Sequence, residues 1–211
     1  MMDDALQREV AARMVKEFAE RGTEVVLVGS TAIVALGLYP KTSKDVDAPA
    51  PGRLGLDAAR KLASRMAQDL GLVLEERGWG TLSLVNKVGE RVAWRVDLLV
   101  PESGPIPLAA ARLVRRRATR TEIGLAAIAE HILVMKAVAF GDMLGKGLEE
   151  EALKYEGDVE ELRQTLPTDF DIKAVRELLG AFPAARAVRA TQLINEKFGT
   201  SIREPPSPDV A

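Results

Sequence analysis

Two short stretches decide the fold expected for this chain: VVLVGS at residues 25–30 and DVD at residues 45–47. The first reads as a short buried strand that ends at Gly29-Ser30, with a helix predicted from Thr31 to Leu38. The second predicts the next strand, 45–48. Because side chains alternate along a strand, the two carboxylates of DVD lie on one face, ~6.5 Å apart.

A third carboxylate follows on a later strand. The segments 81–87 and 91–100 alternate and flank a turn at 88–90, which predicts a hairpin. Asp97 lies in the otherwise apolar end of its second strand, where a lone charge is costly unless it is paired. Arg91 and Arg95 are possible partners.

The three carboxylates Asp45, Asp47 and Asp97 are the candidate catalytic and metal-binding residues. Close carboxylates repel one another, and hard oxygen ligands suit Mg²⁺ or Mn²⁺, which removes that penalty. Without metal, replacement of these aspartates by asparagine is therefore expected to leave stability unchanged or raised. An Asp-x-Asp pair alone is common on solvated strands, and Gly-Ser before a helix is often only a turn and cap. Their order and spacing together favour a functional site.

This combination resembles the DNA polymerase β-like nucleotidyltransferase superfamily, in which Gly-Ser opens a helix and Asp-x-Asp and a third acidic residue follow on later strands. The stretch TSKDVD at 42–47 is similar to minimal members related to abortive-infection toxins. The segment ILVMKAVA at 132–139, and an acidic helix start at Asp158, are similar to a later helical part of those proteins. The acidic segment 145–157 departs from their short basic loop.

The resemblance implies a Mg²⁺-dependent transfer of a nucleoside monophosphate from an NTP such as ATP to a hydroxyl acceptor. The acceptor could be an RNA 3′ end, a protein or a small molecule. The resemblance also implies that Gly29 and Ser30 hold the triphosphate and that Lys136 reaches a phosphate. Alternatively, Lys136 only extends from an apolar helix towards solvent.

Two other functions stay open at this point. A degenerate protein of the same fold would bind a nucleotide or a partner without catalysis, and a metal-dependent nuclease could use the same carboxylates. A dense basic run also follows the last acidic strand, and it either contacts an RNA such as tRNA or is a solvated face. In that run Arg115, Arg116 and Arg117 are the candidate acceptor-binding residues, flanked by Arg112 and Arg120. A cognate antitoxin is a further possible partner.

Composition narrows the class of protein. The chain has 211 residues, a net charge of -2, no Cys and a single His, His131, so thiolate and multi-His metal sites within one chain are excluded. No membrane span or signal peptide is expected, which predicts a cytoplasmic protein, and the charged, Cys-free composition fits a thermophilic source. We predict an α/β (α+β) fold with a nucleotidyltransferase-type mixed β-sheet flanked by helices over 1–125. An apolar stripe and the following Gly71 predict a helix at 56–70. A helical C-terminal domain over 126–203, whose predicted helices include 148–155 and 158–166, and a frayed tail over 204–211 complete the prediction.

Overall fold

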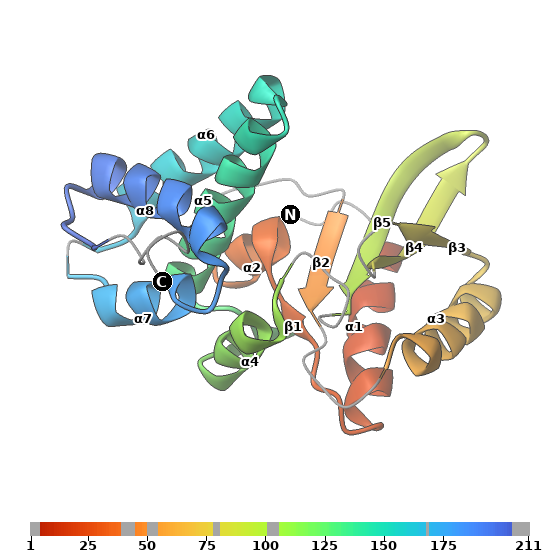
Figure 1. Cartoon of the computed structure of the whole chain (residues 1–211). Helices are drawn as coiled ribbons and strands as arrows, with labels where there is room; N and C mark the ends of the chain where they lie inside the picture. The colour runs from red at the N-terminus through yellow and green to blue at the C-terminus, as the bar shows by residue number, and fades with distance from the viewer. Residues whose placement is uncertain are drawn as a thin grey trace. The chain divides into compact units, whose positions relative to one another are not determined.

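The computed structural model of the chain describes residues 5–38, 45–49, 55–77, 81–100, 106–167 and 169–203 (Figure 1). The chain divides into two compact units, an N-terminal unit Met1–Ala127 and a helical unit Ile128–Ala211. The division falls between Ala127 and Ile128, two residues after the boundary predicted from the sequence, which followed Leu125. The predicted tail 204–211 and the first three residues of TSKDVD, 42–44, lie outside the described residues.

The larger sheet of the N-terminal unit has the strand order β2-β5-β4-β3. Strand β2 runs parallel to β5, while β4 pairs antiparallel with both β5 and β3. The β4–β5 hairpin turns at Gly89 with φ +63°, a left-handed conformation that glycine adopts without steric cost. This is the mixed sheet that the sequence predicted. The strand bounds are β2 (Asp45–Pro49), β3 (Val73–Arg77), β4 (Thr81–Val88) and β5 (Arg91–Leu99).

One face of this sheet belongs to the apolar core. Helix α1 (Ala5–Ala19) contacts β5, and helix α3 (Leu56–Leu70) contacts β3 and β4. Helix α3 has the predicted bounds, and Gly71 ends it in the left-handed conformation with φ +66°. Because side chains alternate along a strand, the opposite face of β2 and β5 carries the polar residues. The buried apolar side chains of this core include Val10, Met14, Phe18, Val46, Leu62, Met66, Leu82, Leu84, Val96 and Leu98.

A smaller sheet joins β1 (Val26–Leu27), β7 (Gly124–Ala126) and β6 (Thr119–Thr121), in that order. Immediately after β1, the backbone N–H of Val28 donates a hydrogen bond of 2.9 Å to the carbonyl oxygen of Asp47, which ties β1 to β2. Helix α2 (Gly29–Ala35) then begins. Its predicted bounds, 31–38, are wrong, because Gly29 takes a φ of +60° and so turns the chain from strand into helix two residues earlier.

The basic run contains both a helix and a strand. Helix α4 (Leu108–Arg116) buries Ala110, Ala111 and Val114, and its arginines therefore face away from the core. The chain then forms the β6–β7 hairpin, so that Arg120 lies on a strand while Arg112, Arg115 and Arg116 lie on the helix.

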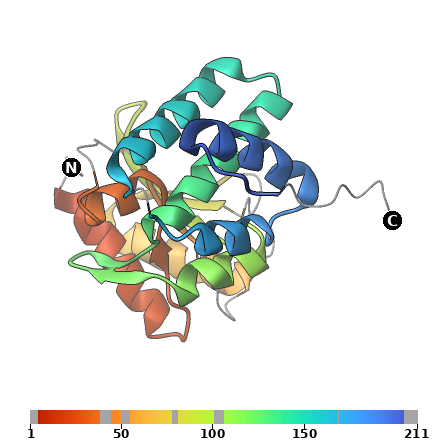
Figure 2. The same ribbon diagram turned by 90° about the vertical axis from the view of Figure 1, so that its left-hand side faces the viewer.

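The helical unit packs three helices against α5 (Ala129–Gly145), as the turned view also shows (Figure 2). Its other helices are α6 (Glu149–Thr165), α7 (Ile172–Leu179) and α8 (Ala184–Phe198). The sequence predicted two helices, 148–155 and 158–166, where the structure has α6 alone. Ala152, Val159 and Leu162 form one buried stripe that continues past Gly157, and helical packing therefore outweighs the low helix propensity of glycine.

The length and the composition of the helices bear on membrane crossing. Within the described part of the chain, none combines the length and the apolar character that crossing a membrane requires.

Candidate active site

Strands β2 and β5 bring the three predicted carboxylates to one face of the sheet. The parallel register places Asp47 opposite Asp97 and Asp45 opposite Arg95. Asp45 and Asp47 are half-buried, whereas Asp97 is only 4 % exposed. Residues separated by fifty positions in the chain therefore form one polar cluster on adjacent strands.

Arg95 is the cation of this cluster. Its Nη2 donates to Asp45 Oδ2 at 3.0 Å and its Nε donates to Asp97 Oδ2 at 3.1 Å. Of the two partners that the sequence left open for Asp97, the structure shows Arg95, while Arg91 lies at the exposed hairpin end of β5. The expectation of uncompensated repulsion between the carboxylates without metal is therefore corrected, because the guanidinium already supplies positive charge.

The polar row continues across the sheet onto β4. Ser83 lies opposite Asp97 in the antiparallel register and is fully buried. Neither Ser83 Oγ nor Asp97 Oδ1 has a hydrogen-bond partner among the described residues. Burying two neighbouring polar oxygens without hydrogen-bond partners costs folding free energy, unless a further polar group or a cation binds them. Ser83 was not predicted as a site residue, because its alternation with Leu82 and Leu84 indicates a strand face but not the neighbour Asp97 on that face.

At the edge of the row, Glu75 on β3 lies opposite Ser83. The hydrogen bond that Lys87 donates to Glu75, with an N–O distance of 2.7 Å, holds the pKa of that carboxyl below its ordinary value. The positive charges of Arg77 and Arg95 lower the same pKa further. The edge of the row is therefore an ionised surface pair, separate from the buried Asp97.

The donor set fits a hard divalent cation in its chemistry. Carboxylate oxygens from neighbouring strands and the partnerless Oδ1 of Asp97 are suitable ligands for Mg²⁺ or Mn²⁺. In the described residues, however, no three His, Asp or Glu side chains are arranged to hold a metal ion. In the same cluster, Arg95 bonds to one oxygen of Asp45 and one of Asp97.

The start of α2 lies against the same carboxylates. A Cβ built on Gly29 would lie 2.9 Å from Asp47 Oδ2, so only glycine fits without displacing that side chain. Thr31, which the sequence analysis did not single out, donates its hydroxyl to the carbonyl oxygen of Asp45 at 3.2 Å and is fully buried. Helix α2 is thus fastened to β2 on both sides of Ser30. With seven residues α2 is short, and a contribution of its dipole is correspondingly small.

Lys136 lies in the helical unit and not among the residues of the sheet. Its Nζ is 2.7 Å from Asp158 Oδ2 and 5.3 Å from the ring centre of Tyr155, and the residue is 8 % exposed. The structure therefore gives Lys136 a buried ion pair between α5 and α6. Its contact with a phosphate stays a prediction.

Of the candidate acceptor-binding arginines, Arg115 and Arg116 end helix α4, and Arg117 is the next residue. Arg115 is exposed, and its Nε donates to Glu24 Oε2 at 2.6 Å. Arg116 is exposed and Arg117 half-buried. These residues form a basic surface, of which Arg115 is already neutralised by Glu24.

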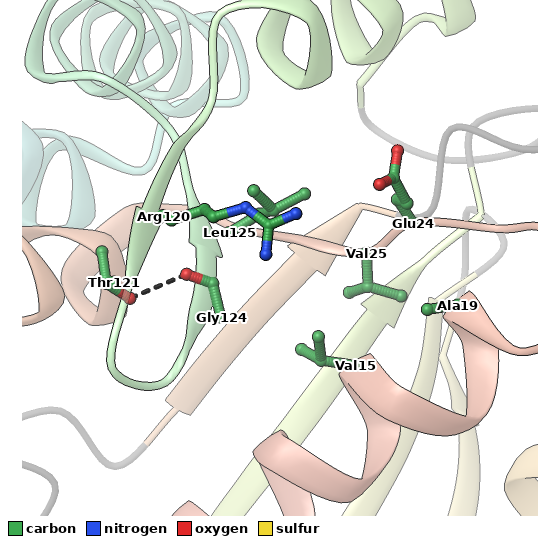
Figure 3. A pocket seen from close by; sticks show the side chains of 8 residues that line it. All are labelled: Val15, Ala19, Glu24, Val25, Arg120, Thr121, Gly124 and Leu125. Carbon is green, nitrogen blue, oxygen red and sulfur yellow. Dashed lines mark hydrogen bonds between the residues drawn. The ribbon is translucent and has the colours of Figure 1, made fainter.

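A pocket of about 240 Å³ lies between α1 and the β6–β7 hairpin (Figure 3). Arg120 and Glu24 flank an apolar interior, and Thr121 donates to the carbonyl oxygen of Gly124 at 2.8 Å. None of the three aspartates lines it. The lining residues are Val15, Ala19, Glu24, Val25, Arg120, Thr121, Gly124 and Leu125.

The sequence matches no protein-family model and no curated protein. Among solved structures, the chain is similar to nucleotidyltransferases and nucleotidyltransferase-like proteins. An antigenic nucleotidyltransferase-like protein from Paracoccidioides brasiliensis is 15 % identical, with 96 % of each chain covered and a TM-score of 0.47. The antibiotic-resistance factor ANT(2'')-Ia is 15 % identical, with 93 % of this chain and 95 % of that chain covered and a TM-score of 0.45.

A Thermotoga maritima CCA-adding enzyme complexed with tRNA is 16 % identical, with 93 % of this chain and 53 % of that chain covered and a TM-score of 0.35. The α/β fold predicted from the sequence is confirmed by the chain's own elements: a strand, a helix opening at Gly29, and acidic residues on the two strands β2 and β5. With TM-scores below 0.5 for these neighbours, the function proposed below rests on the residues of this chain.

Proposed function

We propose that this chain is a divalent-metal-dependent nucleotidyltransferase. The observation that carries the proposal is the pairing of Asp47 with the buried Asp97 on adjacent parallel strands, directly against the Gly29 start of α2. Few side chains are enough for nucleotidyl transfer, because the reaction depends on positioning and charge neutralisation more than on covalent chemistry by the protein.

In the proposed reaction, an acceptor hydroxyl oxygen forms a bond to the α-phosphorus of an NTP. The bond from that phosphorus to the bridging oxygen of the β-phosphate breaks, and pyrophosphate leaves. Asp97 accepts the proton of the hydroxyl, while Gly29 and Ser30 hold the triphosphate. Mg²⁺ or Mn²⁺, held by Asp45, Asp47 and Asp97, would supply neutralisation of the phosphate charge.

The bonds of Arg95 favour a second candidate function. A protein in which Arg95 stays permanently bonded to Asp45 and Asp97 would bind a nucleotide or a partner protein without catalysis. Incubation of the protein with each α-labelled NTP, Mg²⁺ and total RNA, followed by separation of RNA, protein and small products, distinguishes the two. Label in one product class supports transfer and identifies the acceptor, whereas no label with an NTP-dependent rise in melting temperature supports binding alone.

Ser30→Ala is expected to weaken NTP binding by about 1 to 2 kcal/mol, the loss of one charge-assisted hydrogen bond. Titration calorimetry with a non-hydrolysable NTP measures the change. Ser64→Ala on α3, another half-buried helical serine, is the matched control and should bind as the wild type does. Equal affinity of Ser30→Ala and Ser64→Ala would leave Ser30 with a structural role only.

An RNA acceptor makes a separate prediction for the arginines at the C-terminal end of α4. Changing Arg115, Arg116 and Arg117 to Ser should reduce the slope of the logarithm of the RNA binding constant against the logarithm of salt concentration by about 1 to 2. Each phosphate contact on a single strand contributes about 0.7 to that slope. Arg115 contributes least, because Glu24 already pairs with it. NTP affinity should not change. If the triple variant and the wild type show the same salt dependence, the acceptor is sought among proteins and small hydroxyl compounds.

A further inference from the structure

Arg95 bonds to the carboxylates that the proposed function assigns to the metal. The oxygens that it contacts are Oδ2 of Asp45, at 3.0 Å, and Oδ2 of Asp97, at 3.1 Å. These bonds join β5 to β2 across the parallel register, and 30 % of the Arg95 side chain is exposed. A single cation thus bonds to two carboxylates in the apoprotein and offsets part of their negative charge.

Burial makes this neutralisation necessary. The side chain of Asp97 is 6 % exposed, and a buried carboxylate is costly without a counter-charge. Arg77 also approaches Asp97 Oδ2, but at 3.7 Å and from a side chain that is 48 % exposed. Arg95 is therefore the stronger of the two contacts and the one that links Asp97 to Asp45.

A divalent cation and the guanidinium compete for the same charge. A cation held at Asp97 Oδ1, the oxygen without a described partner, would lie beside a guanidinium bonded to Oδ2 of the same carboxylate. Like charges at such separations repel strongly where solvent screening is weak. Asp45 meets the same competition, because its Oδ2 accepts from the same guanidinium, so a cation that approaches this carboxylate also approaches Arg95.

We propose that Arg95 is an internal counter-ion that occupies the acidic cluster in the absence of metal and must release Asp45 and Asp97 before a divalent cation is fully bound. Arg95 is thus a positioning residue that sets the metal affinity of the site. The inference rests on the proposed function insofar as these three aspartates are the metal ligands.

The direct test is Mn²⁺ binding by titration calorimetry, without nucleotide, to the wild type, Arg95→Gln and Arg91→Gln. Removing the competing cation should tighten Mn²⁺ binding in Arg95→Gln by about ten- to a hundredfold. This factor corresponds to the charged hydrogen bond of Arg95 that Mn²⁺ has to break in the wild-type apoprotein. Arg91→Gln, the same change on the same strand but at the exposed hairpin end, should bind as the wild type does. Unchanged or weaker Mn²⁺ binding by Arg95→Gln overturns the proposal.

A melting measurement separates competition from a merely structural role. Arg95→Gln should melt below the wild type without metal and recover most of the difference in saturating Mn²⁺, because the cation replaces the lost positive charge. A purely structural arginine would lower both melting temperatures equally, and that result contradicts the proposal. If Arg95→Gln does not fold, Arg95→Lys serves instead: it retains a charge but cannot bridge two carboxylates in the same way, and it should bind Mn²⁺ with intermediate affinity.

The same proteins keep this inference distinguishable from the proposed function. Tighter Mn²⁺ binding by Arg95→Gln with no label transfer by any variant supports the counter-ion and contradicts the transferase. Transfer by the wild type with unchanged Mn²⁺ affinity in Arg95→Gln supports the transferase and overturns the counter-ion. If neither the wild type nor Arg95→Gln binds Mn²⁺, both are overturned.

Discussion

Asp97→Asn is expected to lower nucleotidyl transfer by about a thousandfold or more, equivalent to about 4 kcal/mol of transition-state stabilisation. Asparagine retains the shape of the side chain but lacks the charge that binds a divalent cation and the basicity that accepts a proton. Asp45→Asn and Asp47→Asn are expected to act in the same direction. Transfer of label from an α-labelled NTP, measured as an initial rate, gives the size of the effect.

The substitution also tests the role of Arg95 in stability. Because Arg95 loses a charged acceptor, Asp97→Asn should lower the free energy of unfolding of the apoprotein by about 1 to 3 kcal/mol. Glu75→Gln is the control, since it removes a carboxylate from the same row of the sheet at its exposed edge. It should leave transfer unchanged. Wild-type transfer rates in Asp97→Asn would remove Asp97 from the active site.

Gly29→Ala is expected to lower transfer by about a hundredfold, in line with the cost of misplacing a catalytic group by about an ångström. Its Cβ would lie 2.9 Å from Asp47 Oδ2, so the carboxylate must shift from its observed position. The left-handed φ of +60° adds about 1 to 2 kcal/mol of destabilisation for any residue with a Cβ. Rate measurements and chemical denaturation report the two effects separately.

Gly37→Ala is the matched control for this experiment. Gly37 follows the same helix with a φ of +65°, yet a Cβ there has no described neighbour within 4 Å. Both variants should therefore lose similar stability, and only Gly29→Ala should lose transfer. Equal transfer rates in the two variants would show that the contact with Asp47 is without consequence for the reaction.

Local periodicity predicted much of the N-terminal unit. Helix α3 was predicted with its observed bounds, because its apolar stripe and the glycine that ends it are local signals. The β4–β5 hairpin was predicted from its alternation and its turn. Periodicity was less informative for α6, which was predicted as two helices, 148–155 and 158–166, and which a continuous buried stripe makes into one.

The candidate site was only partly predictable. The sequence indicated which aspartates share a strand face, since alternation is a local property. It left open whether Asp97 pairs with Arg91 or Arg95, and it did not single out Ser83 or Thr31. Ser83 and Thr31 acquire their roles from neighbouring strands and from the approach of α2 to β2, which the pattern within one segment does not encode.

By itself, the sequence determined the order of the site's parts: a glycine turn, two alternating carboxylates, and a third carboxylate in an apolar strand. Tertiary structure decided how they combine. The parallel register of β2 and β5 places Asp47 opposite Asp97 and lets Arg95 bond to both Asp45 and Asp97. Alternation along a strand follows from local backbone geometry, whereas the pairing of distant strands and the counter-charge of a buried carboxylate depend on packing across the whole unit.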